Sequence, residues 1–468
     1  MKRALVLSLG CLLTLATAQA EDLKGVYERA LANDPQIREA DANRRAAREA
    51  KPQAWAAVLP QITGSAARTR TDQTSVGQTA QELEQPTGSG NRVVLNFISS
   101  NETKPKADRW SLDLRQSVFS WANWVALFKA DRQVAQAEAD YQSSEQQLIT
   151  RVADAYFNVL AAKDNVDSQS SAFAAISRQL EQAEKRFEVG LIAITDVQEA
   201  KAARDSSAAA VIVAKRTLAT AEEALREITG DSYQALAKPG DSLPLRAPEP
   251  ADENKWIEQA MEQNLALISS RLAADIARDN LRASFGGHLP TVDLTATKSN
   301  NDQKGPIYFS SGNVGKSASN VDTKVYALQV TMPIFSGGAA QSRVRQSEYQ
   351  WQAARERLTR TTRQTERAAR DAYLGVMSDM SRVKALAQAL ESSRTALKAT
   401  EAGYEVGTRT AVEVLDSRRT LAQAETNYSR SRYDYILSVL KLRLASGVLD
   451  RKLLEEVNGW LTESAKLR

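Results

Sequence analysis

The chain has 468 residues, with 61 Lys and Arg against 57 Asp and Glu, so its formal net charge is only +4. So small a charge on so long a chain gives no basis for nucleic-acid binding. The single histidine, His288, has no Cys, His and Asp cluster near it at metal-ligand spacing. The sequence also has no phosphate-binding loop, nucleophile elbow or dinucleotide fingerprint. We therefore expect no enzymatic activity, no cofactor and no metal.

The N-terminus predicts export. Met1-Lys2-Arg3 is charged, residues 4–16 are apolar but too few to span a bilayer, and Ala18-Gln19-Ala20 has the form of a cleavage site. We expect residues 1–20 to be a signal peptide, whose removal takes away Cys11, the only cysteine, and leaves 59 basic against 57 acidic residues. The weaker alternatives are a buried N-terminal helix and a lipoprotein signal ending at Cys11, which would have a short apolar region.

The second half of the chain repeats the first. Several motifs recur at a separation of 217 positions, 371 minus 154 in the first case: Asp154-Ala155-Tyr156 and Asp371-Ala372-Tyr373, Phe187-Glu188-Val189-Gly190 and Tyr404-Glu405-Val406-Gly407, Gly230 and Gly447. A separation that stays constant predicts one structural unit built twice and packed against its copy. We place the first repeat at 21–230 and the second at 254–447, joined by a linker at 231–253 and followed by a tail at 448–468.

Each repeat contains two segments in which apolar and polar residues alternate, as in β-strands. The four strands are expected at about 61–70, 109–119, 291–299 and 324–335. Polar stretches at 71–108 and 298–323 join them and are expected to be loops. The first loop carries 14 extra residues. Before the loop, Leu59-Pro60 matches Leu289-Pro290 at a separation of 230 positions, and after it Val118-Phe119 matches Ile334-Phe335 at a separation of 216, so the difference, 230 minus 216, is 14.

Long helices follow the strands. Residues 121–189 contain neither proline nor glycine, and apolar residues from Leu148 to Val166 recur at steps of four and three, the pattern of a coiled coil. We expect helices at 121–189 and 338–406, each roughly 100 Å long at 1.5 Å per residue. Gly190 and Gly407 suit left-handed C-terminal caps.

Shorter helices are expected to return at 196–228 and 412–445. Thr195-Asp196-Val197-Gln198 and Thr410-Ala411-Val412-Glu413 both have the form of a capping box. The two threonines are 215 positions apart, 410 minus 195, which predicts that the repeats are not equivalent at this tip.

An exported chain without a transmembrane helix can still cross the outer membrane as a closed β-barrel. Four strands cannot close, and barrels near eight strands are filled by side chains, so three chains with twelve strands form the smallest attractive conduit. The fold class is therefore mainly α, with long antiparallel coiled-coil helices and a transmembrane β part. The alternatives are a soluble sandwich of hairpins and a periplasmic coiled-coil adaptor or structural protein without a pore.

The tip sequences Arg186-Phe187-Glu188-Val189-Gly190-Leu191 and Glu401-Ala402-Gly403-Tyr404-Glu405-Val406-Gly407-Thr408-Arg409-Thr410 resemble the TolC-type outer-membrane factor family of Gram-negative exit ducts. The resemblance covers essentially the whole mature chain. It implies a homotrimer with a twelve-stranded barrel in outer-membrane lipid and a twelve-helix tunnel in the periplasm. The linker and the tail would form a belt around the tunnel. The implied function is a passive duct for efflux and type I secretion, and the implied partners are a periplasmic adaptor and an inner-membrane ABC or proton-driven transporter.

The same resemblance implies roles at the tip. Thr195, Asp196, Tyr404 and Arg409 match the residues of a gate latch. Glu413 and Asp416 match acidic rings at the narrowest point, and their i, i+3 spacing puts both carboxylates on one helix face. The turns at Gly190, Leu191, Gly407 and Thr408 would contact the adaptor. Glu413 could instead serve only the capping box, and Arg409 could be merely solvated.

One motif has no role implied by the family. Arg360, Arg363, Arg367 and Arg370 follow 3, 4, 3 spacing and form a basic ridge on one helix face. The ridge could be solvated or paired with carboxylates such as Glu138 and Glu145. Alternatively it could line the lumen and favour anionic cargo.

Overall fold

The computed structural model describes residues 20–84, 92–240, 243–309 and 311–467. The expected signal peptide, apart from Ala20, lies outside the described residues. The chain divides into two compact units. The helical unit comprises Met1–Ala47, Ala135–Ala274 and Ala354–Arg468, and the sheet unit comprises Arg48–Val134 and Asp275–Ala353.

The sheet unit is built on four long antiparallel strands in the order β1, β4, β6, β7. These are β1 Gln61–Arg70, β4 Lys106–Phe119, β6 Thr291–Phe309 and β7 Val314–Thr331. Within the described residues, β1 and β7 each pair on one side only. Every residue of β1 is exposed, including Ile62, and β7 exposes Leu328 and Val330. The two edges and their apolar side chains are thus uncovered in a single copy.

The segments expected as loops contain strands. The strands β2 Gln73–Glu84 and β3 Arg92–Thr103 pair with each other as the β2–β3 hairpin, and among the described residues this hairpin pairs with β6 only at Asn101, Glu102 and Thr103. In the second repeat, β6 extends to Phe309 and β7 begins at Val314. Both strands therefore run through the segment that was expected to be a loop. The prediction of loops at 71–108 and 298–323 was wrong for these parts, because a ladder of backbone hydrogen bonds forms even where polar side chains hide the alternation. β7 ends at Thr331, before Pro333, which has no N–H for the ladder.

The helices differ widely in length. They are α1 Leu23–Asn33, α2 Pro35–Arg48, α3 Ala50–Ala56, α4 Trp121–Glu188, α5 Ile194–Thr229, α6 Glu253–Gln263, α7 Leu265–Phe285, α8 Ala339–Glu405, α9 Ala411–Ala445 and α10 Arg451–Gly459, with the short 3-10 helix η1 Gly286–His288. Among the described residues, none of the helices combines the length and the apolar character needed to cross a membrane.

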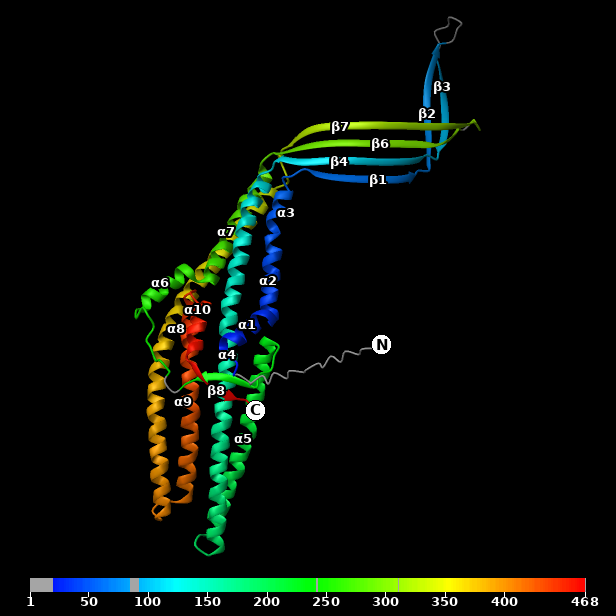
Figure 1. Cartoon of the computed structure of the whole chain (residues 1–468). Coiled ribbons are helices and arrows are strands. Elements are labelled where there is room, and N and C mark those ends of the chain that lie inside the picture. Colours follow the sequence, from blue (N-terminus) through cyan, green and yellow to red (C-terminus); the bar gives the residue numbers. More distant parts are fainter. Residues whose placement is uncertain (1–19, 85–91, 241–242, 310, 468) are drawn as a thin grey trace, which may run out of the picture. The chain divides into compact units, whose positions relative to one another are not determined.

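The core of the helical unit lies where α4 meets α9. Tyr156, Phe157 and Ile436 are completely or almost completely buried there, and the Phe157 ring stacks on Tyr433 at 5.7 Å between centroids. Figure 1 shows the lower helices in the order α8, α9, α4 and α5 across the view. The helix α5 also packs against α9, where Ala203 and Leu415 form a buried cluster with Ile176 of α4.

The linker and the tail, which lie far apart in sequence, pair with each other. β5 Ala235–Pro239 from the linker forms a two-stranded antiparallel sheet with β8 Leu461–Lys466 from the tail. Tyr156 of α4 donates its hydroxyl hydrogen to the Ala237 carbonyl at 2.5 Å. This small sheet is thereby anchored on the long helix.

Candidate gate at the helix tips

The turn between α4 and α5 is closed by Gly190. Its φ of +82° lies in the left-handed region, which favours glycine. The Gly190 N–H donates to the Phe187 carbonyl at 2.8 Å, and the Leu191 N–H donates to the Arg186 carbonyl at 2.9 Å. These two bonds form a Schellman motif, which satisfies carbonyls at the helix end.

The turn between α8 and α9 has the same construction. Gly407 has a φ of +78°, its N–H donates to the Tyr404 carbonyl at 3.2 Å, and the Thr408 N–H donates to the Gly403 carbonyl at 2.8 Å. The left-handed caps predicted at Gly190 and Gly407 are therefore confirmed. Leu191, Val189 and Val406 are each at least 70% exposed. The tips thus present apolar side chains to their surroundings.

The two returning helices begin differently. Thr410 is the N-cap of α9, and its Oγ1 accepts from the Glu413 N–H at 3.3 Å while Glu413 Oε2 accepts from the Thr410 N–H at 2.9 Å, a complete capping box. The N-cap of α5 is Ala193, without a side-chain bond, so the capping box predicted at Thr195 was wrong. The N-caps Ala193 of α5 and Thr410 of α9 are equivalent in position, because 410 minus 193 is 217. The predicted difference between the repeats at this tip therefore lies in the chemistry of the two caps.

Asp196 and Thr195 lie within the first turn of α5. Asp196 is the acidic residue of that turn, where the partial positive charge of a helix N-terminus favours a carboxylate. Within the described part of this single copy, no hydrogen bond joins Thr195 or Asp196 to Tyr404 or Arg409. The structure of one chain therefore does not bring the four predicted latch residues together.

Arg409 instead bonds within its own turn. Its Nη1 lies 3.2 Å from Glu413 Oε1. The hydrogen bond from the Thr410 N–H, with help from Arg409, lowers the pKa of the partly exposed Glu413 carboxyl below its usual value. Asp416 lies one helix turn further on, 3.9 Å from Arg419 Nη1. Glu413 thus completes the capping box and pairs with Arg409, and it is also the predicted ring residue.

Two further tip residues were not predicted from the sequence. The Arg186 guanidinium of α4 lies 5.2 Å from the centre of the Tyr404 ring on α8, a cation–π contact between the two hairpins. A Cβ on Gly403 would lie 2.7 Å from Cγ of Arg409, so glycine there makes room for the Arg409 side chain. The repeat itself could have pointed to Arg186 and Gly403. These two residues occupy equivalent positions, because 403 minus 186 is 217, and the repeats have different residue types there.

The basic ridge is exposed on α8, opposite the buried Thr365 and Ala369. Arg370 Nε donates to Glu253 Oε1 at 2.6 Å, and Arg367 lies 4.0 Å from Asp371. The suggested pairing with Glu138 and Glu145 is wrong within this copy. Those carboxylates lie 3.4 Å from Arg44 and 3.9 Å from Arg451, respectively.

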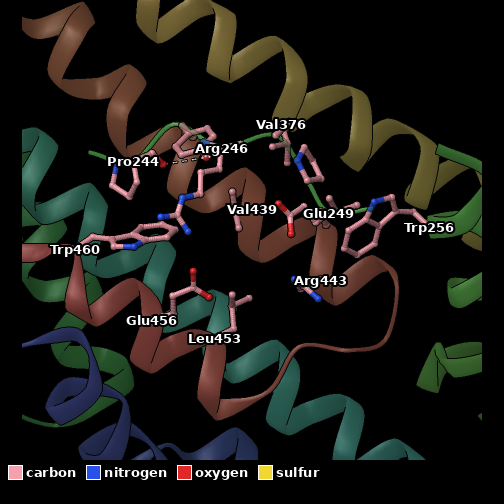
Figure 2. Close-up of a pocket in the computed structure, with 14 residues that line it drawn as sticks. Pro244, Arg246, Glu249, Trp256, Val376, Val439, Arg443, Leu453, Glu456 and Trp460 are labelled. Carbon is pink, nitrogen blue, oxygen red and sulfur yellow. Dashed lines mark hydrogen bonds between the residues drawn. The ribbon is translucent and has the colours of Figure 1, made fainter. Parts of the chain in front are cut away.

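A cavity of about 230 Å³ lies under the linker, between α9 and α10 (Figure 2). Tyr435 holds the linker above it, accepting from the Arg246 N–H at 2.9 Å. Trp256 and Trp460 line its two sides, with Arg443 over the Trp256 ring at 5.1 Å. Over the described ranges, no group of His, Cys, Asp and Glu side chains is arranged to hold a metal ion.

The fold is that of outer-membrane channels. The crystal structure of the Campylobacter jejuni CmeC outer membrane channel matches it with a TM-score of 0.72, 17% identity, and coverage of 94% of this chain and 90% of that one. At the level of sequence, the chain belongs to the outer membrane efflux protein family, whose model matches residues 26–231 and 256–448. It is therefore located in the outer membrane of a Gram-negative bacterium and extends into the periplasm.

Two relatives match over nearly the whole chain. The outer membrane protein TolC of Vibrio cholerae serotype O1 is 35% identical over 475 residues, covering 100% of both chains. The outer membrane protein TolC of Escherichia coli K12 is 35% identical over 468 residues, covering 99% of this chain and 90% of the relative. The resemblance seen in the tip sequences is thereby confirmed.

Proposed function

We propose that this chain forms a homotrimeric exit duct, passive and gated at its periplasmic tip, for efflux pumps and type I secretion systems. The trimer is supported by the observation that the sheet of a single copy is incomplete. Among the described residues, one copy supplies a sheet whose edge strands β1 and β7 are each paired on one side only, together with the four helices α4, α5, α8 and α9. In lipid each unpaired backbone group costs several kcal/mol, so the edges need partners, and three copies would supply twelve strands and twelve helices.

The proposed partners are a periplasmic adaptor and an inner-membrane transporter of the ABC or proton-driven class. The turns at Gly190, Leu191, Gly407 and Thr408 would receive the adaptor. Their support is the exposed apolar surface at the tips, since Leu191 is 72% and Val406 is 76% exposed. The transporter would supply both the energy and the choice of cargo.

The proposed gate uses contacts between hairpins. Tyr404 and Arg409 would meet Thr195 and Asp196 of a neighbouring helix pair and hold the tip closed. Arg409 would then exchange its bond to Glu413 for charge-assisted bonds worth about 1.5–3 kcal/mol each. Glu413 and Asp416 from three copies would put six carboxylates around one axis and favour cations there.

The tests are heat-resistant trimers from outer-membrane fractions and conductance in planar bilayers. We expect Tyr404→Phe with Arg409→Ser to conduct more than wild type, because a gate of a few kcal/mol is repeated in three copies. Arg204→Ser, an exposed arginine on α5, is the matched control. A latch variant that conducts like wild type would show that the latch roles are wrong.

The ring needs a gentler substitution than alanine, because the Glu413 side chain also completes the capping box of α9. Glu413→Gln with Asp416→Asn removes both charges and keeps a capping side chain. We expect weaker cation selectivity and weaker block by multivalent cations. Retained selectivity would remove Glu413 and Asp416 from the gate, and a monodisperse monomer that conducts ions would refute the trimeric duct itself.

A further inference from the structure

The four long strands of the sheet have two chemically different faces. Residues directly opposite each other in a ladder share a face, and every second residue along a strand returns to it. Leu112 lies opposite Lys298, and Lys298 lies opposite Lys324, so the even-numbered residues of β1, β4, β6 and β7 share one face. This even-numbered face carries the apolar side chains of Ile62, Leu112, Leu114, Leu294, Tyr326 and Leu328. The odd-numbered face is mainly polar, with Thr63, Ser65, Ser111, Asp113, Asp293 and Thr297.

The register also gives the order of residues along the even-numbered face. In the proposed barrel an apolar face meets lipid and a polar face lines the lumen. The strand ends at Phe119 and Thr291 lead into the periplasmic helices, so the opposite strand ends point out of the cell.

Two aromatic residues mark a level on this face. Tyr326 of β7 is 78% exposed, and two residues further out along the ladder Lys298 lies opposite Lys324. Trp110 of β4, which is 42% exposed, occupies the next row outward, opposite Asn300. Exposed aromatic rings are typical of the boundary between hydrocarbon and headgroups. The lysine row therefore lies at the outer membrane interface, where a charge on the lipid face costs little.

Lys298 and Lys324 place two like charges side by side. Side chains directly opposite each other have Cβ atoms about 4.5–5.5 Å apart, and like charges there are unfavourable. Both lysines are exposed, and across the residues that the structure describes neither forms an ion pair. The Lys298 ammonium lies 5.7 Å from the centre of the Trp110 ring, one row further out. Lys298 therefore extends along the aromatic ring toward the headgroups.

The carboxylates in the next rows outward do not compensate this pair. Each has another partner: Arg68 lies 2.5 Å from Asp108, Lys304 lies 2.7 Å from Asp302, and the Asn300 amide donates to Asp322 at 2.8 Å. The paired charges of this face are thus balanced within the sheet, whereas the two lysines require an anion from outside it.

We propose that Lys298 and Lys324 bind a phosphate group of lipid A, the phosphorylated glycolipid of the outer leaflet. This inference rests on the proposed barrel and names a lipid that its outer rim holds. A phosphate monoester carries a charge of about −1.5 to −2 and has three strong acceptor oxygens, so it accepts hydrogen bonds from both ammonium groups. Trp110 lies beside the headgroup, and Tyr326 gives the acyl chains an apolar surface. The position near the outer strand ends selects lipid A over the phospholipids of the periplasmic leaflet.

Native mass spectrometry of detergent-solubilised trimers titrated with lipid A tests the site. We expect one tightly held lipid A molecule per copy in wild type. Lys298→Gln with Lys324→Gln should weaken this binding by about tenfold for each lysine lost, because hydrogen bonds between charged groups are removed. Lys298→Arg with Lys324→Arg should retain it, since the charges remain.

Lys106→Gln with Lys316→Gln is the matched control. Both residues are exposed lysines of the same face, but they lie six and eight residues further out along their ladders, about 20 Å or more at 3.3 Å per residue. This control should bind lipid A like wild type.

The outcomes separate this inference from the proposed function. Wild-type affinity for lipid A in a trimeric Lys298→Gln and Lys324→Gln variant would overturn the site and leave the proposed duct standing. Phosphatidylglycerol that binds as tightly as lipid A and is lost in the same variant would also overturn the assignment, because the surface would then accept any anionic lipid. Wild-type protein without any trimer would overturn the proposed function instead.

Discussion

Gly407→Ala tests how the α8–α9 tip is built. A Cβ at Gly407 would meet nothing within 4 Å, so the substitution causes no clash and acts only through the φ of +78°. An L-residue in the left-handed region costs about 1–2 kcal/mol. That cost corresponds to roughly five- to thirtyfold more frequent local opening of the turn.

The measurement is hydrogen exchange of the tip peptides by mass spectrometry, in wild type and variant trimers. We expect faster exchange confined to the end of α8 and the start of α9, with no change in the core between α4 and α9. Gly459→Ala is the control, because that glycine also has open space around its Cβ position but no positive φ. Equal exchange rates in wild type and Gly407→Ala would refute the reasoning, since no other cost of the substitution is present.

Three further predictions follow from the fold. Thr410→Ala should destabilise the start of α9 by about 1 kcal/mol and Ala193→Thr should stabilise the start of α5 by a similar amount, as measured by exchange of the two turns. Removing most of the β2–β3 hairpin should leave heat-resistant trimers intact, because its described residues pair with β6 at only three positions; loss of the trimer would make the hairpin part of the assembly. Burial raises the pKa of the Asp164 carboxyl, so its stabilising contribution is greatest below the ordinary value of 3.8 and is lost as pH rises through the raised value. Asp164→Asn should flatten the trimer's pH-dependent melting in that window, and an unchanged profile would contradict this role.

The sequence by itself determined the features that depend on local chemistry or on the repeat. Unbroken helical composition predicted the long helix α4, and the repeat extended that prediction to α8. The glycines predicted the left-handed caps at Gly190 and Gly407, because no other residue adopts that conformation at so little cost. The duplication predicted two equivalent hairpins. The tip motifs identified the family, because each is a specific and uninterrupted amino-acid sequence.

Only the tertiary structure decided features that depend on neighbours distant in sequence. The β2–β3 hairpin escaped prediction because its Ser, Thr and Asn residues look like a loop, while strand pairing needs only backbone partners. The start of α5 at Ile194, after the N-cap Ala193, was hidden because Thr195 has the form of a cap. The partners of the basic ridge and the contact between Arg186 and Tyr404 depend on which helices lie side by side. Local sequence specifies each helix and its ends, whereas packing between helices decides which of its faces meets a neighbour.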